Sequence, residues 1–200
     1  MSPQLYLASR SPRRQQLLRQ LNLRFKVLLT EVSEQRAPGQ SPSQYACAVA
    51  LAKAQAGTHF AQQGLPVLGA DTDVVLDGEI LGKPVNRDAG LTMLAKLSGR
   101  KHDVVSAVAL VSGGRSESVV SITRVTFAKI SPTEAAAYWD SGEPADKAGA
   151  YAIQGIGARF VQHIDGSYSG VMGLPLYETC ELLGRFGVEA SLTITPSASA

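Results

Sequence analysis

The stretch PVLGADTDVVLDGEILGKP constrains the fold more than any other part of this sequence. Its Asp77-Gly78 pair stands between two apolar runs, which is the strongest short-range signal of a two-residue β-hairpin. The sequence therefore predicts antiparallel neighbouring strands at Val67–Leu76 and Glu79–Leu81. Asp71 lies inside the first of these strands, among apolar residues rather than in a polar loop.

Strands and helices alternate in the part of the chain before this hairpin. Apolar periodicity predicts strands at Gln4–Ala8 and Phe25–Leu29, with a helix at Pro12–Leu21 between them. A second helix is expected from Pro42 to about Ala56, ending near Gly57. Both kinds of element therefore precede the hairpin.

The second half of the chain is richer in strands and in glycine. DVVSAVALV and SVVSITRVTFAKI are expected to be strands joined across Gly113-Gly114. The region DKAGAYAIQGIGARFVQHIDGSYSGVMGLP is weakly periodic, and loop-rich stretches of this length inside a compact domain are more often functional than idle. The other predicted elements are a helix after Asn86 that ends at Gly99, a helix from Pro132 to about Asp140, a strand at Arg159–Ile164 and a helix at Pro175–Phe186.

Length and composition limit the classes of protein that this chain can be. Its 200 residues, 44% of them hydrophobic, can bury the core of one large domain or of two small lobes. We expect a single domain over residues 1–190 and a flexible tail over 191–200, and a change in sequence texture near residue 130 suggests two lobes around a cleft. The net charge of +2 is far below the basic excess of a nucleic-acid-binding domain, so no stable nucleic-acid partner is expected and any anion site must be local.

Targeting segments and metal-binding motifs are not evident in the sequence. The stretch MSPQLYLASR lacks the basic start and the long apolar run of a signal peptide, and no apolar run approaches the ~20 residues that span a membrane, so we expect a cytoplasmic protein with no membrane partner. Cys47 and Cys180 lack metal or redox spacing and are expected to be reduced thiols in or near the core. His59, His102 and His163 are widely scattered, so each is expected to be a surface or strand residue rather than a zinc ligand.

Three predicted helices begin with the dipeptide Ser-Pro, but one of them differs from the others. In two of them the third residue after the serine is Gln44 or Glu134, which completes a capping box. In the first it is Arg14, preceded by Arg13, although a cation in the first turn opposes the helix dipole. The exchange makes sense if an anion binds at this helix start. The alternative is a pair of surface arginines that use nearby carboxylates.

Asp71 is the most informative acidic residue. Burying a carboxylate in an apolar strand costs on the order of several kcal/mol, because the charge loses its water, unless a cation or hydrogen bonds compensate this loss. Candidate roles are magnesium binding, general-base catalysis or both. The alternative is a strand-end aspartate that accepts hydrogen bonds from loop N–H groups.

Further polar residues can contribute to a nucleotide site. Lys53, late in the second helix, and Lys83, just after the hairpin, could contact phosphates, although each alone is typical of a solvated surface lysine. Gln154 offers a donor and an acceptor that suit the edge of a nucleobase, or that bond to its own loop. The phosphate-loop, dinucleotide-binding, nucleophile-elbow and H-E-x-x-H motifs are all missing from the sequence. The residues alone indicate a phosphate-bearing ligand, handled by cations and a buried aspartate with a divalent metal.

Taken together, six short motifs resemble those of the Maf family of nucleotide pyrophosphatases. They are LASRSPRR, TEVSEQR, GADT, LGKP, DKAGAYAIQG and GLPLYET, and they occur in the order that the family has. The resemblance covers the chain from Leu5 to about Phe186. The resemblance implies an α/β fold with a mixed, strongly bent central sheet flanked by helices and two lobes around a cleft, as in inosine triphosphate pyrophosphatases. It also implies a homodimeric enzyme that uses Mg or Mn to hydrolyse nucleoside triphosphates to monophosphate and pyrophosphate.

The resemblance also implies roles for individual residues. Asp71 is similar to the residue that accepts a proton from the attacking water, and Glu34, in TEVSEQR, would bind the divalent metal with it. The residues that would hold the substrate are Ser9, Arg13, Arg14, Lys53 and Lys83.

Three positions separate the branches of the family. Arg13, Thr72 and Gln154 match the branch that prefers dTTP and UTP. This implies hydrolysis of dTTP and UTP, and of modified pyrimidine nucleotides. A pyrophosphatase for purine or methylated nucleotides, and a non-catalytic nucleotide sensor linked to septum formation, are the alternatives. Asp73 stands where the family usually has an aliphatic residue. Because it would share a strand face with Asp71, it is expected either to contact the metal or to raise the pKa of Asp71 by like-charge repulsion.

Overall fold

The computed structural model describes residues 2–61 and 64–190 and contains one mixed β-sheet. Its strands are β1 (Leu5–Leu7), β2 (Phe25–Val27), β3 (Val67–Leu76), β4 (Glu79–Leu81), β5 (Lys101–Ser112), β6 (Arg115–Phe127) and β7 (Val161–Asp165). They lie in the order β2-β1-β3-β5-β6-β7, with β4 also paired to β3. The pairs of β1 with β2 and with β3 are parallel and the others are antiparallel, so the predicted mixed α/β sheet is confirmed.

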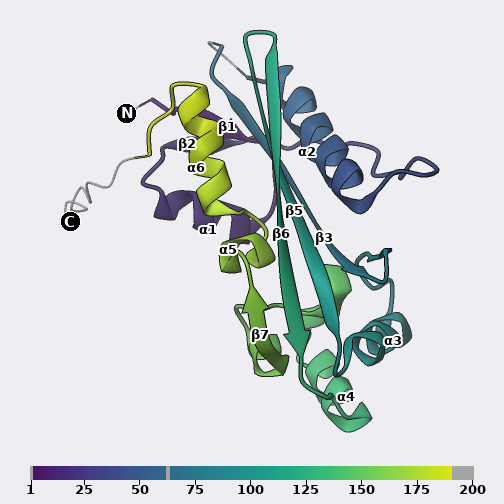
Figure 1. The fold of residues 1–200 in the computed structure, drawn as a ribbon. Coiled ribbons are helices and arrows are strands. Elements are labelled where there is room, and N and C mark those ends of the chain that lie inside the picture. Colours follow the sequence, from purple (N-terminus) through teal and green to yellow (C-terminus); the bar gives the residue numbers. More distant parts are fainter. Residues whose placement is uncertain (1, 62–63, 191–200) are drawn as a thin grey trace, which may run out of the picture.

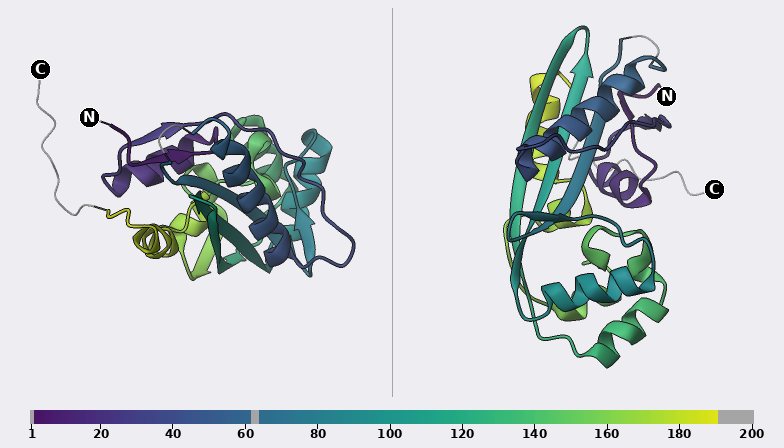
Figure 2. Two further views of the ribbon diagram at one scale, coloured as in Figure 1. Left: turned by 90° about the horizontal axis from the view of Figure 1, so that it is seen from above. Right: turned by 90° about the vertical axis from the view of Figure 1, so that its right-hand side faces the viewer.

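Helices flank this sheet and gather around the two ends of its long strands (Figures 1 and 2). The α-helices are α1 (Pro12–Gln20), α2 (Pro42–Thr58), α3 (Arg87–Leu97), α4 (Pro132–Asp140), α5 (Tyr168–Met172) and α6 (Leu176–Arg185). Three short 3-10 helices are η1 (Glu143–Asp146), η2 (Ala148–Ala150) and η3 (Ile156–Phe160). In Figure 1, α1, α2 and α6 surround one end of β5 and β6, whereas α3 and α4 lie at the other end, which gives the two expected lobes.

One edge of β3 changes its partner along the length of the strand. Val67 and Leu68 pair with β1, and residues 74–76 pair with β4. Between them, residues 69–73 have no strand on this edge within the described part of the chain. The opposite edge pairs continuously with β5, from Val67 to Val75. The sheet therefore splits at the point where Asp71 lies.

The helix α2 packs on β3 with almost no side chains between the two backbones. A Cβ added to Gly69 would lie 2.1 Å from the carbonyl oxygen of Ala50 and 2.7 Å from the nitrogen of Ala54. Ala46, Ala50 and Ala54 are fully buried and recur at a spacing of four residues, which places them on one helix face. This close packing of α2 therefore fixes the distance of Lys53 from the middle of β3.

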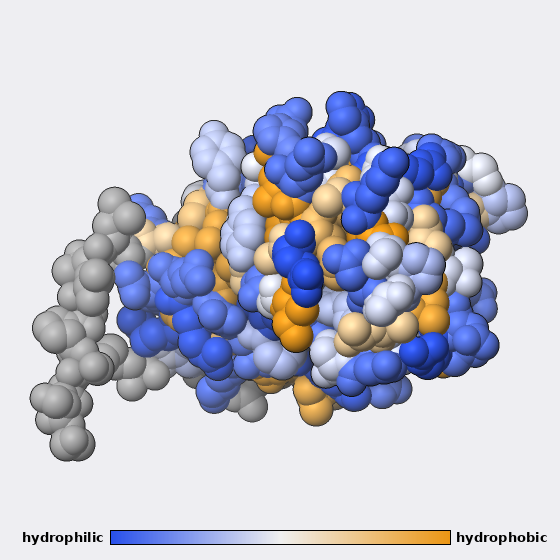
Figure 3. Space-filling model, turned by 90° about the horizontal axis from the view of Figure 1, so that it is seen from below, coloured by the Kyte–Doolittle hydropathy of each residue, from blue (hydrophilic) through white to orange (hydrophobic). Residues whose placement is uncertain are grey.

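The larger part of the core lies on the opposite face of the sheet. Its buried side chains come from every layer of the fold and include Leu5, Leu7, Leu17, Leu68, Leu94, Phe127 and Leu182. Figure 3 shows mainly hydrophilic side chains over one outer face of the molecule, with apolar ones scattered among them, as is normal for a folded protein. No helix in the described segments is long and apolar enough to cross a membrane.

The turn and cap predictions are confirmed. Asp77 and Gly78 have φ values of 51° and 80°, as the hairpin turn between β3 and β4 requires. Gly113-Gly114 joins β5 to β6 with both residues at positive φ. The Asn86 side chain accepts a hydrogen bond from Ala89 N at 2.9 Å and so caps α3.

Some boundaries differ from the prediction. The second helix was expected to end near Gly57, and α2 ends one residue later, at Thr58. Gly57 also packs against β3, since its Cβ would lie 2.6 Å from a Val67 methyl group. The strand predicted from Arg159 begins only at Val161, since residues 156–160 form η3. The helix α5 was not predicted, because five residues are too few to display a period. The expected flexible tail at 191–200 lies outside the described residues.

Replacing Gly69 with alanine tests the contact between α2 and β3. We expect G69A to lower the free energy of unfolding by about 1–3 kcal/mol, because the new methyl group meets the helix backbone. Urea unfolding measures the change. G184A is the control, since Gly184 lies in α6 with nothing within 4 Å of an added Cβ, and this variant is expected to be neutral or slightly stabilised. An unchanged midpoint for G69A would contradict the described seating of α2.

Candidate functional site

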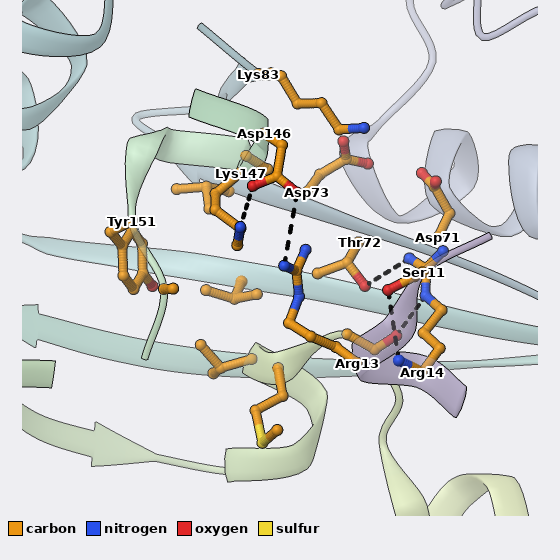
Figure 4. A pocket seen from close by; sticks show the side chains of 18 of the residues that line it. Ser11, Arg13, Arg14, Asp71, Thr72, Asp73, Lys83, Asp146, Lys147 and Tyr151 are labelled. Carbon is orange, nitrogen blue, oxygen red and sulfur yellow. Dashed lines mark hydrogen bonds and ion pairs between the residues drawn. The ribbon is translucent and has the colours of Figure 1, made fainter. Parts of the chain in front are cut away.

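A cavity of about 370 Å³ opens where the edge of β3 is free (Figure 4). Asp71 and Asp73 enter it from the α2 side of the sheet, and Thr72, which points the other way, lines it too. The start of α1 forms one wall, and the segment from Asp146 to Gln154 forms another. The cavity thus lies between the two lobes, where the cleft was expected.

The structure brings the predicted site residues together. Those that line the cavity are Arg13, Arg14, Glu34, Lys53, Asp71, Thr72, Lys83 and Gln154. Ser9 lines an adjoining cavity of about 350 Å³ that shares both arginines and both lysines with the first. Residues far apart in the sequence therefore form one continuous, strongly charged site.

The start of α1 differs from the other Ser-Pro helix starts, as predicted. The Ser11 hydroxyl accepts a hydrogen bond from Arg14 N at 3.4 Å, and this helix has no capping box. The capping boxes completed by Gln44 in α2 and Glu134 in α4 are both present. The exchange of a capping residue for a cation is thus a real feature of this helix.

Arg14 is fixed within the protein, whereas Arg13 reaches across the cleft. The Arg14 guanidinium donates to the Gly173 carbonyl at 2.8 Å and to the Ser9 and Thr72 hydroxyls, each at 3.3 Å. Burial is the main cause that lowers the pKa of Arg14. Surface pairing with carboxylates is therefore the wrong explanation for Arg14. Pairing with a carboxylate does apply to Arg13, whose NH1 lies 3.9 Å from a carboxylate oxygen of Asp146.

Lys53 compensates the buried charge of Asp71. Its Nζ lies 2.8 Å from Asp71 Oδ1 and 2.7 Å from Glu34 Oε1, and the Lys53 and Asp71 side chains are only 15% and 12% exposed. Burial raises the pKa of Glu34, but the hydrogen bond and charge of Lys53 outweigh it, so the net shift is downward. Asp71 lies inside β3 and accepts from a lysine, so the strand-end alternative is wrong.

Asp73 lies on the same strand face as Asp71 but has a different environment. Its Oδ2 is buried and has no hydrogen-bond partner among the described residues. Burial, followed by the negative charge of Asp71, raises the pKa of Asp73 to about 7. Like-charge repulsion between the two carboxylates thus contributes to the raised pKa of Asp73, while Lys53 forms its ion pair with Asp71.

The acidic residues of the cavity suit a hard divalent cation. Glu34, Asp71 and Asp73 offer carboxylate oxygens, which are the donors that Mg²⁺ and Mn²⁺ prefer. Within residues 2–61 and 64–190, no three His, Cys, Asp or Glu side chains are spaced to hold a metal by themselves. Magnesium usually needs only one or two carboxylates in addition to substrate phosphates. With the unpartnered oxygen of Asp73, this donor set fits an ion that arrives with a phosphate ligand.

The lining residues that were not predicted include Tyr45, Asp146, Lys147 and Tyr151. Tyr45 donates from its hydroxyl to the Glu34 carbonyl at 2.9 Å, and burial raises the pKa of Tyr45 to about 12. Asp146 pairs with Arg13 and with Lys147, and the Tyr151 ring forms a wall of the cavity. Three of the four belong to DKAGAYAIQG, so the motif that carries the resemblance also held the signal that could have identified them.

A buried histidine, His102, contacts the Tyr151 side chain that lines the cavity. His102 lies in β5, in agreement with its predicted strand position, and its Nε2 is hydrogen bonded to the Tyr151 hydroxyl at 2.9 Å. Both rings pack edge-on against Phe127. Burial lowers the pKa of His102 to about 4. The folded protein therefore holds His102 neutral at a pH at which the unfolded chain is protonated.

This histidine predicts an acid-sensitive stability. Between about pH 6.5 and pH 4 the unfolded state binds the proton more strongly, so stability is lost as the pH falls through this range, by up to roughly 3 kcal/mol. Urea unfolding at pH 7.5 and pH 4.5 measures the loss, which should shrink in H102Q. H163N, at an exposed position, is the control. An equal loss in H102Q and wild type would contradict the assignment.

Comparisons with known proteins show the family of this chain. The family model described as "Maf-like protein" matches residues 4–186. A dTTP/UTP pyrophosphatase of Saccharophagus degradans is 48% identical over 98% of this chain and 94% of that protein. Proteins of the same name from Yersinia pestis and Xanthomonas euvesicatoria are 54% and 52% identical, over 91% and 92% of this chain and 92% and 98% of their own lengths.

Among solved structures, the Staphylococcus aureus Ham1 protein overlaps in part. It shares 16% identity and a TM-score of 0.43, over 64% of this chain and 72% of that one. The family model and the curated relatives span nearly the whole chain. The chain belongs to the Maf family.

Proposed function

We propose that this chain is a nucleoside triphosphate pyrophosphatase that converts dTTP and UTP to the monophosphate and pyrophosphate. The observation that carries the proposal is the buried pair of Lys53 and Asp71 in a cavity lined by cations from both lobes. The names of relatives about 50% identical over most of the chain support the same activity and the same substrates.

Asp71 is the proposed general base. Its carboxylate accepts a proton from a water molecule while that water attacks the α-phosphorus. The new bond joins the water oxygen to the α-phosphorus, and the bond to the oxygen that bridges the α- and β-phosphates breaks. The electron pair of that bond leaves with pyrophosphate. Lys53 positions Asp71 for this step, since it contacts one of its two oxygens.

The cations of the cavity would bind the triphosphate and stabilise the leaving group. Arg13 and Lys83 are the best placed, because Arg14 and Lys53 are already hydrogen bonded within the protein. Preorganised cations at the position where charge develops are usually the largest contribution to this kind of catalysis. The N-terminus of α1 adds its partial positive charge.

We propose that Mg²⁺ or Mn²⁺ is required. Glu34 and Asp71 would hold the ion, with the unpartnered oxygen of Asp73 as a further ligand. When bound, such an ion neutralises phosphate oxygens and favours attack at phosphorus. The protein's own contribution is the arrangement of these carboxylates around Lys53.

Arg13, Thr72 and Gln154 are the proposed specificity residues. The Thr72 hydroxyl is fixed by Arg14 and by the Ser106 hydroxyl at 3.0 Å, which in turn donates to the Gly170 carbonyl. Gln154 offers both a donor and an acceptor to the edge of a pyrimidine base. The two residues approach the cavity from opposite lobes, which suits a ligand that spans the cleft.

Asp71→Asn tests the general base. We expect turnover of dTTP to fall about 100-fold or more, while the nucleotide dissociation constant changes only a few-fold. Pyrophosphate release and calorimetry measure the two quantities. Asp103→Asn, which changes a half-buried carboxylate on β5 that pairs with Arg124, is the control. Wild-type turnover in the Asp71 variant would remove this residue from the mechanism.

A substrate panel tests the proposed activity. Pyrophosphate release from canonical, methylated and modified nucleoside triphosphates, with Mg²⁺, Mn²⁺ or EDTA, should be fastest for dTTP and UTP and should stop with EDTA. Faster release from purine or methylated nucleotides would overturn the substrate assignment. Binding without release from any nucleotide would indicate the sensor alternative.

The same panel separates two roles of Arg13. If this residue reads the base as well as the phosphates, Arg13→Ala should change the ranking of dTTP, UTP and CTP. The ratios of kcat/KM for the three substrates measure the effect. An equal loss for all three would limit Arg13 to phosphate binding.

A further inference from the structure

We infer that Glu143 is a positioning residue for base recognition: its carboxylate fixes the loop that carries Gln154 at the wall of the cavity. The function of this loop as a reader of the base rests on the function proposed above. Glu143 itself does not line the cavity, so it would act through the loop rather than on the nucleotide.

One carboxylate holds two successive backbone amides after Gln154. Glu143 Oε2 accepts a hydrogen bond from Ile156 N at 2.8 Å, and Oε1 accepts one from Gly157 N at 3.0 Å. These are the first two N–H groups of η3, which has no cap from its own N-terminal residue. Glu143 therefore replaces the missing cap from outside the loop.

Tyr138 extends the same network to the residue before the loop. Its hydroxyl donates to Glu143 Oε1 at 2.6 Å and accepts from Ala152 N at 3.0 Å. The Tyr138 side chain is buried, which fixes the position of this hydroxyl. The chain is thus held on both sides of Gln154 by one tyrosine and one carboxylate.

The loop is shaped to fit the carboxylate. A Cβ added to Gly155 would lie 2.0 Å from Glu143 Oε2, although the φ of −120° at Gly155 is one that any residue can adopt. Glycine is therefore required here by the carboxylate and not by the backbone conformation. Gly157 is similar, because its Cβ would lie 2.5 Å from the Tyr138 hydroxyl.

The position of the Gln154 amide depends on this backbone network. Within the described residues, no hydrogen bond to the Gln154 side chain is present, so the part of Gln154 that the structure fixes is its main chain, from which the side chain extends. The network also includes Lys147, on the same wall of the cavity, whose Nζ donates to the Glu143 carbonyl at 3.3 Å. Burial raises the pKa of Glu143, but the hydrogen bonds from Tyr138, Gly157 and Ile156 produce a net lowering, which favours the charged and more strongly accepting form.

Glu143→Gln tests the inference, because an amide group cannot accept at both ends. We expect KM for dTTP to rise about tenfold, the change that corresponds to one lost charge-assisted hydrogen bond, while kcat changes less than about twofold. Discrimination between dTTP and dATP should fall by about the same factor. Inorganic tripolyphosphate, which has no base, should inhibit the variant and the wild type equally.

Two further sets of variants keep the test specific. Glu134→Gln is the matched control: like Glu143, Glu134 does not line the cavity and accepts hydrogen bonds, here from Ser131 at the start of α4, but its contact with η3 is a 3.7 Å ion pair with the Arg159 side chain and not a hydrogen bond to the loop backbone. Gly155→Ala should reproduce the Glu143→Gln kinetics, because the new methyl group displaces the carboxylate. Added to Glu143→Ala, it should cause no further loss.

The outcomes separate this inference from the proposed function. A fall in kcat with unchanged KM, weaker inhibition by tripolyphosphate, or equal effects in Glu134→Gln would overturn the positioning role. If the wild type releases pyrophosphate from no nucleotide, the proposed function fails. Two other measurements then test whether Glu143 holds the loop. These are hydrogen exchange at the Ile156 and Gly157 amides, which should accelerate in Glu143→Gln, and calorimetric binding of dTTP, which should weaken relative to tripolyphosphate.

Discussion

The free stretch on the edge of β3 is the constraint on which the site depends. Over residues 69–73, β3 keeps its ladder with β5, while no described strand pairs with its other edge. Because successive side chains of a strand point to opposite faces, an open edge lets neighbouring residues line one cavity from both sides. Asp71 and Asp73 supply the acidic groups from one face, and Thr72 supplies a hydroxyl from the other.

The close seating of α2 turns this edge into an ordered site. The contact of Gly69 with the helix backbone leaves Lys53 directly over Asp71, so a buried carboxylate receives a buried cation. Asp73, two residues further along, receives none, and its pKa is raised mainly by burial. Two chemically identical side chains on one strand therefore have different surroundings, because among the described residues only Asp71 forms an ion pair with the lysine.

Local signals in the sequence predicted much of the fold. The Asp77-Gly78 turn and the Ser-Pro helix starts depend on neighbouring residues, and the structure confirms them. Gly57 predicted the end of α2 to within one residue, but its close contact with Val67 depends on the tertiary structure and has no local signal. The link from Glu143 to Gly157 has no periodic signature, since a side chain there holds backbone groups 14 residues away. The residues of the site could be named from motifs, but the contacts that hold them depend on tertiary structure.

The two long strands β5 and β6 pair without interruption from Lys101 to Ser112, through both lobes. A hinge needs a few residues that absorb a large change in backbone angles, and a continuous antiparallel ladder offers no such place. The two lobes can therefore approach each other only by a change in the twist of the sheet, spread over many residues. A nucleotide would therefore bind in a cleft whose width is coupled to the twist of the whole sheet and not to the angles of a few hinge residues.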